Sequence, residues 1–151
     1  MPDEISNLES HLGYWLRFVS NHVSHAFRLK VESHGVTVAE WVVLRALFDS
    51  DAVNPSQIAD KIGLTRGAIS KLVDRLVGKG FVLCRAEKTD RRYQTVTLSA
   101  SGRKLVPVLA ELADQNDQEF FGHLSKQERA GLFAVLRNIA QIRALTSIPL
   151  E

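Results

Sequence analysis

The residue types between positions 65 and 78 could bind a polyanion. On a helical wheel that begins at Arg66, one face is apolar and consists of Ile69, Leu72, Val73, Leu76 and Val77. The opposite face is small and polar, with basic edges, and consists of Gly67, Ser70, Lys71, Asp74 and Gly78, flanked by Arg66 on one side and Lys71 and Arg75 on the other. Such a face can lie deep in a major groove, where its basic groups reach phosphates and base edges. The alternative is a charged helix face that is merely solvated.

A second basic cluster, Lys88-Thr-Asp90-Arg91-Arg92, lies between two β-rich runs. An arginine at the tip of a hairpin can enter the minor groove of DNA, where the negative potential is strongest when the groove is narrow. Asp90 could accept a hydrogen bond from the Arg92 guanidinium and fix its direction. It could also form an Asx-turn that only shapes the loop. The sequence leaves both roles open.

The charge of the chain is divided unevenly along its length. The 151 residues include 19 Lys and Arg against 17 Asp and Glu, a net charge of +2. The stretch 61–104 holds eleven of these bases and three of the acids, so it carries +8 and the remainder carries −6. The net charge alone says little about a nucleic-acid partner, but its distribution places such a partner at 61–104.

The composition limits the class of protein. A chain that is 45% hydrophobic and 24% charged is typical of one soluble globular domain. Cys84 is the only cysteine, so no internal disulfide can form. The first residues lack the basic start and apolar run of a secretory signal, and no run of about 18 apolar residues occurs. We therefore expect a cytoplasmic protein that does not span a membrane.

Periodicity and capping signals predict four helices before residue 80. The expected helices are an amphipathic one over 8–31, a second started by the Thr37-Val-Ala-Glu40 capping box, a third near 55–62 started by Asn54, Pro55 and Gln57, and a fourth capped by Thr65 that runs to Lys79 and stops at Gly80. Gly63-Leu64-Thr65 forms a tight turn between the last two. A helix, a three-residue turn and a helix are the spacing of a helix-turn-helix.

The pattern changes after Gly80. Two β-rich runs, 81–85 and 93–98, predict a β-hairpin. Ser99 or Ser101 can cap a fifth helix that reaches about Phe121, with Pro107 either bending it or marking its true first turn. The box Ser125-Lys-Gln-Glu128 opens a sixth helix. No linker is long enough to divide the chain into independent domains.

In this order and spacing, the chain resembles the MarR family of bacterial winged helix-turn-helix transcriptional regulators. The likeness is carried by residues 37–47, by Gln57 to Leu76, by Gly80-Phe-Val82, and by Asp90-Arg-Arg92 followed by Leu98-Ser-Ala-Ser-Gly102. The resemblance implies a mainly α fold with a small β-hairpin wing, namely a winged helix-turn-helix with flanking N- and C-terminal dimerisation helices. It implies one MarR-like chain over 1–151, with the DNA-binding region at 37–100 and dimerisation helices at 5–34 and 101–146.

The resemblance also implies a homodimer whose first, fifth and sixth helices interlock. These helices have apolar faces broader than a small winged domain needs, formed by Leu12, Trp15, Val19, Leu109, Leu112, Leu132, Phe133, Leu136 and Ile139. The alternative is that they complete the core of a monomer.

We therefore expect a sequence-specific DNA-binding transcriptional regulator, a repressor that binds double-stranded DNA at a pseudo-palindromic operator. The expected DNA-binding residues are Thr65, Arg66, Ser70, Lys71, Arg75, Lys88, Asp90, Arg91 and Arg92. Base contacts are assigned to Arg66, Ser70 and Lys71. Arg75 is assigned to phosphate, and Arg91 and Arg92 to the wing.

Many MarR relatives release DNA when a small, often anionic aromatic ligand enters a cleft between the dimer helices and the winged domain. Trp15, Trp41 and Arg45 offer aromatic walls and a cation for a carboxylate, which is the chemistry of such an effector site. Alternatively, both tryptophans are core residues and Arg45 pairs with an acid.

Other chemistries have less support in the sequence. His22 and His25 have no Cys or acidic partner at zinc-ligand spacing, so no metal or cofactor is expected. Cys84 lies beside Val82 and Leu83 in a predicted strand, which favours burial as a small hydrophobe over a redox sensor. No catalytic motif occurs, so we expect no enzyme. The competing function is a winged-helix module that senses a ligand or oxidant without strong DNA binding.

Overall fold

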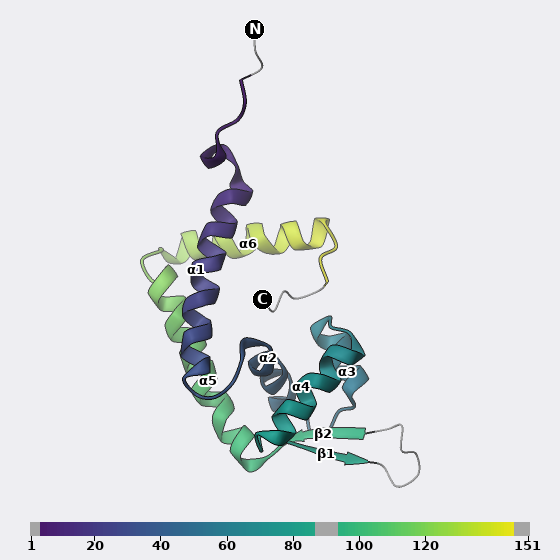
Figure 1. The fold of residues 1–151 in the computed structure, drawn as a ribbon. Helices are drawn as coiled ribbons and strands as arrows, with labels where there is room; N and C mark the ends of the chain where they lie inside the picture. The colour runs from purple at the N-terminus through teal and green to yellow at the C-terminus, as the bar shows by residue number, and fades with distance from the viewer. Residues whose placement is uncertain (1–3, 87–93, 147–151) are drawn as a thin grey trace.

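A computed structural model describes residues 4–86 and 94–146. The described residues form helices and one antiparallel two-stranded sheet, which confirms the predicted fold class (Figure 1). The elements are a 3₁₀ turn (Leu8–Ser10), α1 (Leu12–Glu32), α2 (Val38–Phe48), α3 (Pro55–Ile62), α4 (Arg66–Gly78), β1 (Val82–Ala86), β2 (Gln94–Leu98), α5 (Ala100–Phe121) and α6 (Lys126–Ile142).

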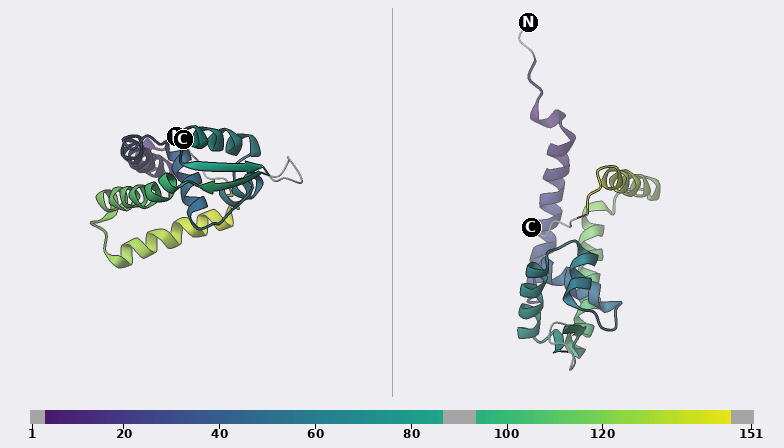
Figure 2. Two further views of the ribbon diagram at one scale, coloured as in Figure 1. Left: turned by 90° about the horizontal axis from the view of Figure 1, so that it is seen from below. Right: turned by 90° about the vertical axis from the view of Figure 1, so that its right-hand side faces the viewer.

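The helices are arranged around a long pair. α1 and α5 run side by side in opposite directions, and α2, α3, α4 and the hairpin pack at one end of this pair (Figure 1). α6 follows the other end of α5 on the side away from α1, and residues 4–11 before α1 project away from the rest of the molecule, as Figure 2 shows. The hairpin and the α6 end therefore lie at opposite ends of the long pair.

Three helices begin at the predicted N-caps, each in a capping box. In α2, Thr37 Oγ1 accepts from the Glu40 N–H at 3.1 Å, and Glu40 Oε1 accepts from the Thr37 N–H at 3.2 Å. The same reciprocal pairs start α3 and α6. Each box satisfies two amides that a helix N-terminus leaves without a partner. Local hydrogen bonding therefore fixes these boundaries.

Two of the helix predictions are corrected in detail. The helix expected over 8–31 is interrupted at His11, whose extended backbone separates the 3₁₀ turn from α1. The Trp15 indole N–H donates to the Glu9 carbonyl at 2.8 Å across this break. Ser99, rather than Ser101, caps α5, which begins at Ala100 and continues through Pro107. Pro107 is therefore not in the first turn.

A polar contact holds α1 against α5. Asn116 is buried, and its amide donates to the Val23 carbonyl at 3.1 Å and accepts from Lys30 Nζ at 3.0 Å. Lys30 Nζ also lies 2.9 Å from Glu119 Oε2. Because the buried amide is bonded on both sides, the contact fixes the register of the two helices without an unsatisfied polar group.

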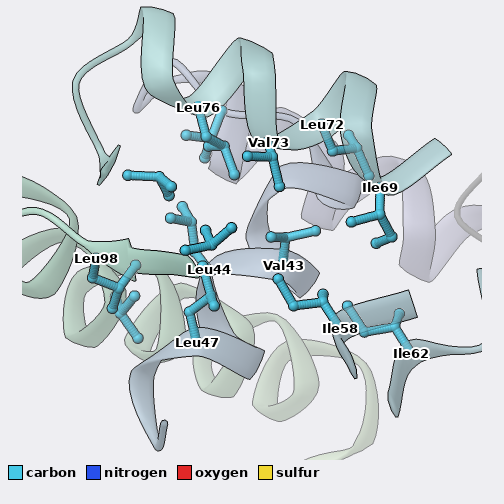
Figure 3. Close-up of a cluster of buried hydrophobic side chains, with 14 of the residues drawn as sticks. Val43, Leu44, Leu47, Ile58, Ile62, Ile69, Leu72, Val73, Leu76 and Leu98 are labelled. Carbon is cyan, nitrogen blue, oxygen red and sulfur yellow. The ribbon is translucent and has the colours of Figure 1, made fainter. Parts of the chain in front are cut away.

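The hydrophobic core lies between α2, α3, α4 and the base of the hairpin. Figure 3 shows its side chains converging: Val43, Leu44 and Leu47 from α2, Ile58 and Ile62 from α3, Ile69, Leu72, Val73 and Leu76 from α4, and Leu98 from β2. Leu109 of α5 is 0% exposed and Leu112 packs against the same cluster. These two residues therefore complete the protein's own core, contrary to their assignment to the apolar dimer face.

The base of the hairpin is bound on two sides. β1 and β2 pair antiparallel, with Val82 opposite Leu98 and Cys84 opposite Val96. On the other edge of β2, Val53 forms an isolated bridge to Val96, with N···O distances of 2.7 and 3.3 Å. This bridge was not predicted from the sequence.

Gly102 allows α5 to approach the segment before β1 closely. A Cβ atom at this position would lie 2.0 Å from the Phe81 carbonyl oxygen, which is far inside van der Waals contact. We expect Gly102→Ala to reduce the free energy of unfolding by at least about 2 kcal/mol, because backbone must move to admit the methyl group. Urea denaturation measures this value.

Gly78→Ala is the matched control. Gly78 is helical and exposed, with nothing near its added Cβ, so alanine should increase stability by roughly 0.5–1 kcal/mol. Equal effects of the two changes would contradict the close approach at Gly102.

Candidate nucleic-acid interface

The outward face of α4 gathers the predicted basic residues. The Thr65 side chain caps the helix by accepting from the Ala68 N–H at 3.1 Å. The exposed side chains of α4 include Arg66, Ser70, Lys71, Asp74 and Arg75. Within 4–86 and 94–146, no carboxylate lies at ion-pair distance from the three basic residues of this face. Their charges are therefore available to an external anion.

The opposite face of α4 is the core face, with one correction. Ile69, Leu72, Val73 and Leu76 are buried as predicted. Val77 is 43% exposed. It lies about 90° from the centre of the apolar face at 100° per residue, so it is at the flank of the helix. The buried side is consequently narrower than the sequence analysis predicted.

α3 and the turn behind it set the direction of α4. Gly63 has φ 79°, a left-handed conformation that suits glycine, and its N–H bonds the Ala59 carbonyl at 2.8 Å. Leu64 then packs against the core, and Thr65 starts the next helix. The predicted helix, turn and helix arrangement is confirmed.

The hairpin follows directly after α4. Arg85 is exposed on β1, and its carbonyl accepts from Thr95 Oγ1 at 3.4 Å. This cation was counted in the basic stretch but not assigned to the interface. Lys88, Asp90, Arg91 and Arg92 lie outside the described residues, so their placement at the wing stays a prediction.

A groove of about 410 Å³ lies on the surface along α2 and α3. It brings together two of the three predicted effector residues. Its lining residues are Trp41, Val42, Arg45, Ala46, Asp49, Lys61 and Ile62. Arg45 Nη1 lies 2.7 Å from Asp49 Oδ2, which agrees with the predicted acidic partner. Trp41 contacts Phe27 edge-on, with ring centroids 6.5 Å apart. The groove thus combines an aromatic wall with two cations, Lys61 and the Arg45 that is paired with Asp49.

Comparison with known proteins supports the predicted resemblance. The MarR family model matches residues 36–93. The HTH-type transcriptional regulator SarZ of Staphylococcus haemolyticus is 26% identical over 134 residues, which are 89% of this chain and 90% of SarZ. The structure of Bordetella bronchiseptica BpsR superimposes with a TM-score of 0.78 at 26% identity, covering 91% of this chain and 98% of that one. The chain is therefore similar to MarR-family regulators, and the family model itself covers residues 36–93.

A structure of MarR itself shows the same fold in contact with DNA. A cysteine-to-serine variant of Escherichia coli MarR, solved with operator DNA, has a TM-score of 0.75 at 23% identity and covers 85% of this chain and 92% of that one. The family resemblance predicted from the sequence is confirmed. The matched relatives are regulators of transcription, which agrees with the expectation of a non-enzymatic protein.

Trp15 lies apart from the groove between α2 and α3. It is half-exposed on α1, where its ring contacts Tyr14 and Phe18 edge-on. Trp41, by contrast, lies on α2 and packs toward the core. The structure therefore brings Trp41 and Arg45 together and leaves Trp15 on the exposed apolar face of α1.

The described residues contain no candidate metal site and no candidate membrane-spanning helix. No group of three His, Cys, Asp or Glu side chains among residues 4–86 and 94–146 could hold a metal ion. Within the same residues, no helix is long and apolar enough to cross a membrane.

Cys84 is exposed on β1, which corrects the prediction that it is buried. Val96, opposite it on β2, is buried, whereas Cys84 lies on β1, the outer strand at this point, because Val53 pairs with the other edge of β2. Its Sγ–H donates to Gln94 Oε1 at 3.4 Å. Partial burial, followed by the negative charge of Asp74, raises the pKa of the Cys84 thiol. Little thiolate is therefore present at neutral pH.

We expect Cys84 to react slowly with iodoacetamide at pH 7, because the thiolate is the reactive form. The midpoint of the rate against pH should lie above that of free cysteine measured in the same buffer. We also expect Cys84→Ser to leave DNA binding unchanged with and without peroxide. A midpoint below that of free cysteine would support the redox-sensing alternative.

Proposed function

We propose that this protein is a transcriptional repressor that binds double-stranded DNA at a pseudo-palindromic operator as a homodimer. The observation that carries the proposal is the exposed basic face of α4, which is capped by Thr65, backed by a buried apolar face and placed directly before an antiparallel hairpin. Similarity to SarZ and to Escherichia coli MarR with operator DNA supports the same reading. The winged helix-turn-helix is the part that contacts DNA.

Each residue of the α4 face has a distinct role in the proposed complex. Arg66, Ser70 and Lys71 reach base edges in the major groove, because they lie on the outward side of the helix. Arg75 binds phosphate, and Thr65 orients the first turn. Lys88, Asp90, Arg91 and Arg92 form the wing contact.

The proposed homodimer covers the apolar faces of α1 and α6. No residue of α6 is buried within the chain, yet much of the helix is apolar. Five of its large apolar side chains are 40–56% exposed: Leu132, Phe133, Val135, Leu136 and Ile139. α1 likewise exposes Leu12, Trp15, Leu16, Phe18 and Val19. Apolar patches of this extent mark protein interfaces. A second copy with the same faces covers them in an isologous dimer.

The groove between α2 and α3 is the proposed effector site. An aromatic carboxylate would pack against Trp41 and pair with Arg45 or Lys61. The structure of BpsR concerns the regulation of its DNA binding by 6-hydroxynicotinic acid, a ligand of this chemical class. Binding of such a ligand in the groove would release the operator.

Arg45→Met tests the effector site. We expect the concentration of an aromatic carboxylate that releases half of the DNA to rise about tenfold, because one charge-assisted contact is lost. Arg103→Met is the control, since Arg103 also lies over the Phe48 ring but does not line the groove. Fluorescence anisotropy of labelled operator measures both. Equal responses of the two variants would place the effector elsewhere.

Selection of bound fragments from random duplex DNA tests the function itself. We expect two inverted half-sites with centres about one helical turn apart, because a two-fold dimer places its α4 helices in successive major grooves. The affinity should fall steeply with salt, with a slope of log K against log salt steeper than about −4. A flat salt response without an enriched sequence would contradict DNA binding and favour the ligand-sensing module.

A further inference from the structure

The turn between α4 and β1 carries an ion pair that links distant segments. Lys79 caps the C-terminus of α4, and Gly80 follows with φ 80°. Lys79 Nζ donates to Glu40 Oε1 at 2.9 Å and to the Gly35 carbonyl at 2.8 Å. One ammonium group therefore connects the end of α4 with the start of α2 and with the turn after α1.

The burial of Glu40 exceeds what its capping role requires. A capping box works with an exposed carboxylate, as the Ser125 and Glu128 box of α6 shows. Glu40 is 0% exposed, and Lys79 Nζ lies 2.9 Å from each of its carboxylate oxygens, with hydrogen-bond geometry only to Oε1. Burial of a carboxylate is costly unless it is paired. The capping box alone thus leaves this burial unexplained.

The same turn is bound to α5 on its other side. Ser99 Oγ donates to the Gly80 carbonyl at 2.6 Å, and the Ser99 N–H donates to the Phe81 carbonyl at 3.0 Å. Gly102 lies directly against that carbonyl. Residues 79–81 are therefore bonded to the start of α2, to the turn after α1 and to the first turn of α5. α5 in turn packs along α1.

We propose that Lys79 and Glu40 are positioning residues that fix the orientation of α4 relative to α1 and α5. The inference rests on the proposed function, in which α1 and α6 join two copies and each α4 enters a major groove. The angle between α4 and the long helices then sets the separation of the two half-sites that the dimer recognises. A shift of one base pair moves a half-site by about 3.4 Å and rotates it by about one tenth of a turn. If α4 is held less firmly, the dimer no longer discriminates between the selected spacing and a spacing that differs by one base pair.

The test uses the double variant Glu40→Gln with Lys79→Met. It leaves no buried unpaired charge, and its net charge equals that of the wild type, so long-range attraction to DNA is unchanged. Glutamine can retain the bond to the Thr37 N–H, because its amide oxygen replaces Oε1. The control is Arg28→Met with Glu32→Gln, which removes a half-exposed pair on α1 and also preserves the net charge. Circular dichroism melting confirms that each variant is folded.

The readout is the affinity for three kinds of duplex: a single half-site, two half-sites at the selected spacing, and two half-sites moved by one base pair. We expect the double variant to bind the single half-site within about twofold of the wild type, and to lose about tenfold at the selected spacing. The ratio of its affinity for the selected spacing to its affinity for the shifted duplex should fall below about threefold, while the control variant keeps the wild-type ratio. The single variant Lys79→Arg, with Glu40 unchanged, retains a cation and should keep most of the wild-type preference for the selected spacing.

Two results would overturn the inference while the proposed function stands. One is a double variant that keeps the wild-type spacing preference, and the other is an equal loss on the single half-site, which would indicate a phosphate contact or a general structural defect. A wild-type protein that binds both spacings equally would overturn the proposed operator recognition, and the positioning role with it.

Discussion

Lys71→Glu should weaken operator binding at least about a hundredfold, because it removes a base contact and places a negative charge against the phosphates. Lys71 is exposed in the middle of α4, so the folded chain tolerates the change. A new pair between positions 71 and 75 at i,i+4 spacing should keep the free energy of unfolding within about 0.5 kcal/mol of the wild type. Anisotropy titration at fixed salt measures the affinity, and urea denaturation measures the stability.

Lys126→Glu is the control for Lys71→Glu. Lys126 is the first residue of α6, away from α4 and the hairpin, and the substitution changes the net charge by the same amount. We expect a loss of less than about threefold, due to long-range electrostatics alone. Equal losses for the two variants would show that the affinity depends on total charge and not on the α4 face.

Leu136→Asp should convert the protein into a monomer. Leu136 is 43% exposed in the single chain, so aspartate costs the fold of one chain little, whereas a charge buried in the proposed dimer face would be unpaired. Light scattering during size-exclusion chromatography should show the mass of one 16.8 kDa chain. Affinity for a two-half-site operator should fall by about two orders of magnitude, because the second half-site no longer benefits from effective concentration.

Asn138→Asp introduces the same side chain two positions further along α6, on the opposite side of the helix. It should leave both the dimer and the operator affinity unchanged. A Leu136→Asp protein that remains dimeric would assign the interface to other residues. A monomer that binds the operator as tightly as the wild type would contradict the need for two subunits.

The sequence predicted those parts of the fold that depend on neighbours within four residues. The boxes Thr37–Glu40, Asn54–Gln57 and Ser125–Glu128 lie where predicted, because capping is a local exchange of hydrogen bonds. Features set by distant contacts were missed or misplaced. Glu40 meets Lys79 across 39 residues, and Val53 pairs with β2 across the whole helix-turn-helix. No periodicity in either segment signals these contacts.

The candidate interface was predicted for a similar reason. The residues of the α4 face come from one helix, so the helical repeat alone places them together. Trp41 and Arg45 share a face of α2 by the same i,i+4 relation, whereas Trp15 belongs to another helix and its position depends on tertiary packing. The exposure of Cys84 likewise depends on β1 being the outer strand of the sheet, which a strand pattern does not encode.

The bridge between Val53 and Val96 protects the hairpin from unwanted strand addition. A two-stranded ribbon has two open edges, and an open edge can pair with a strand from another molecule and begin aggregation. Val53 occupies the backbone groups in the middle of the outer edge of β2, so an incoming strand would find only isolated free groups on either side. The opposite edge, along β1, carries the charged Arg85 on a strand of five residues. The described hairpin therefore has one edge blocked in its middle by Val53 and one short edge that carries a charge, and both features disfavour pairing with a strand from another molecule.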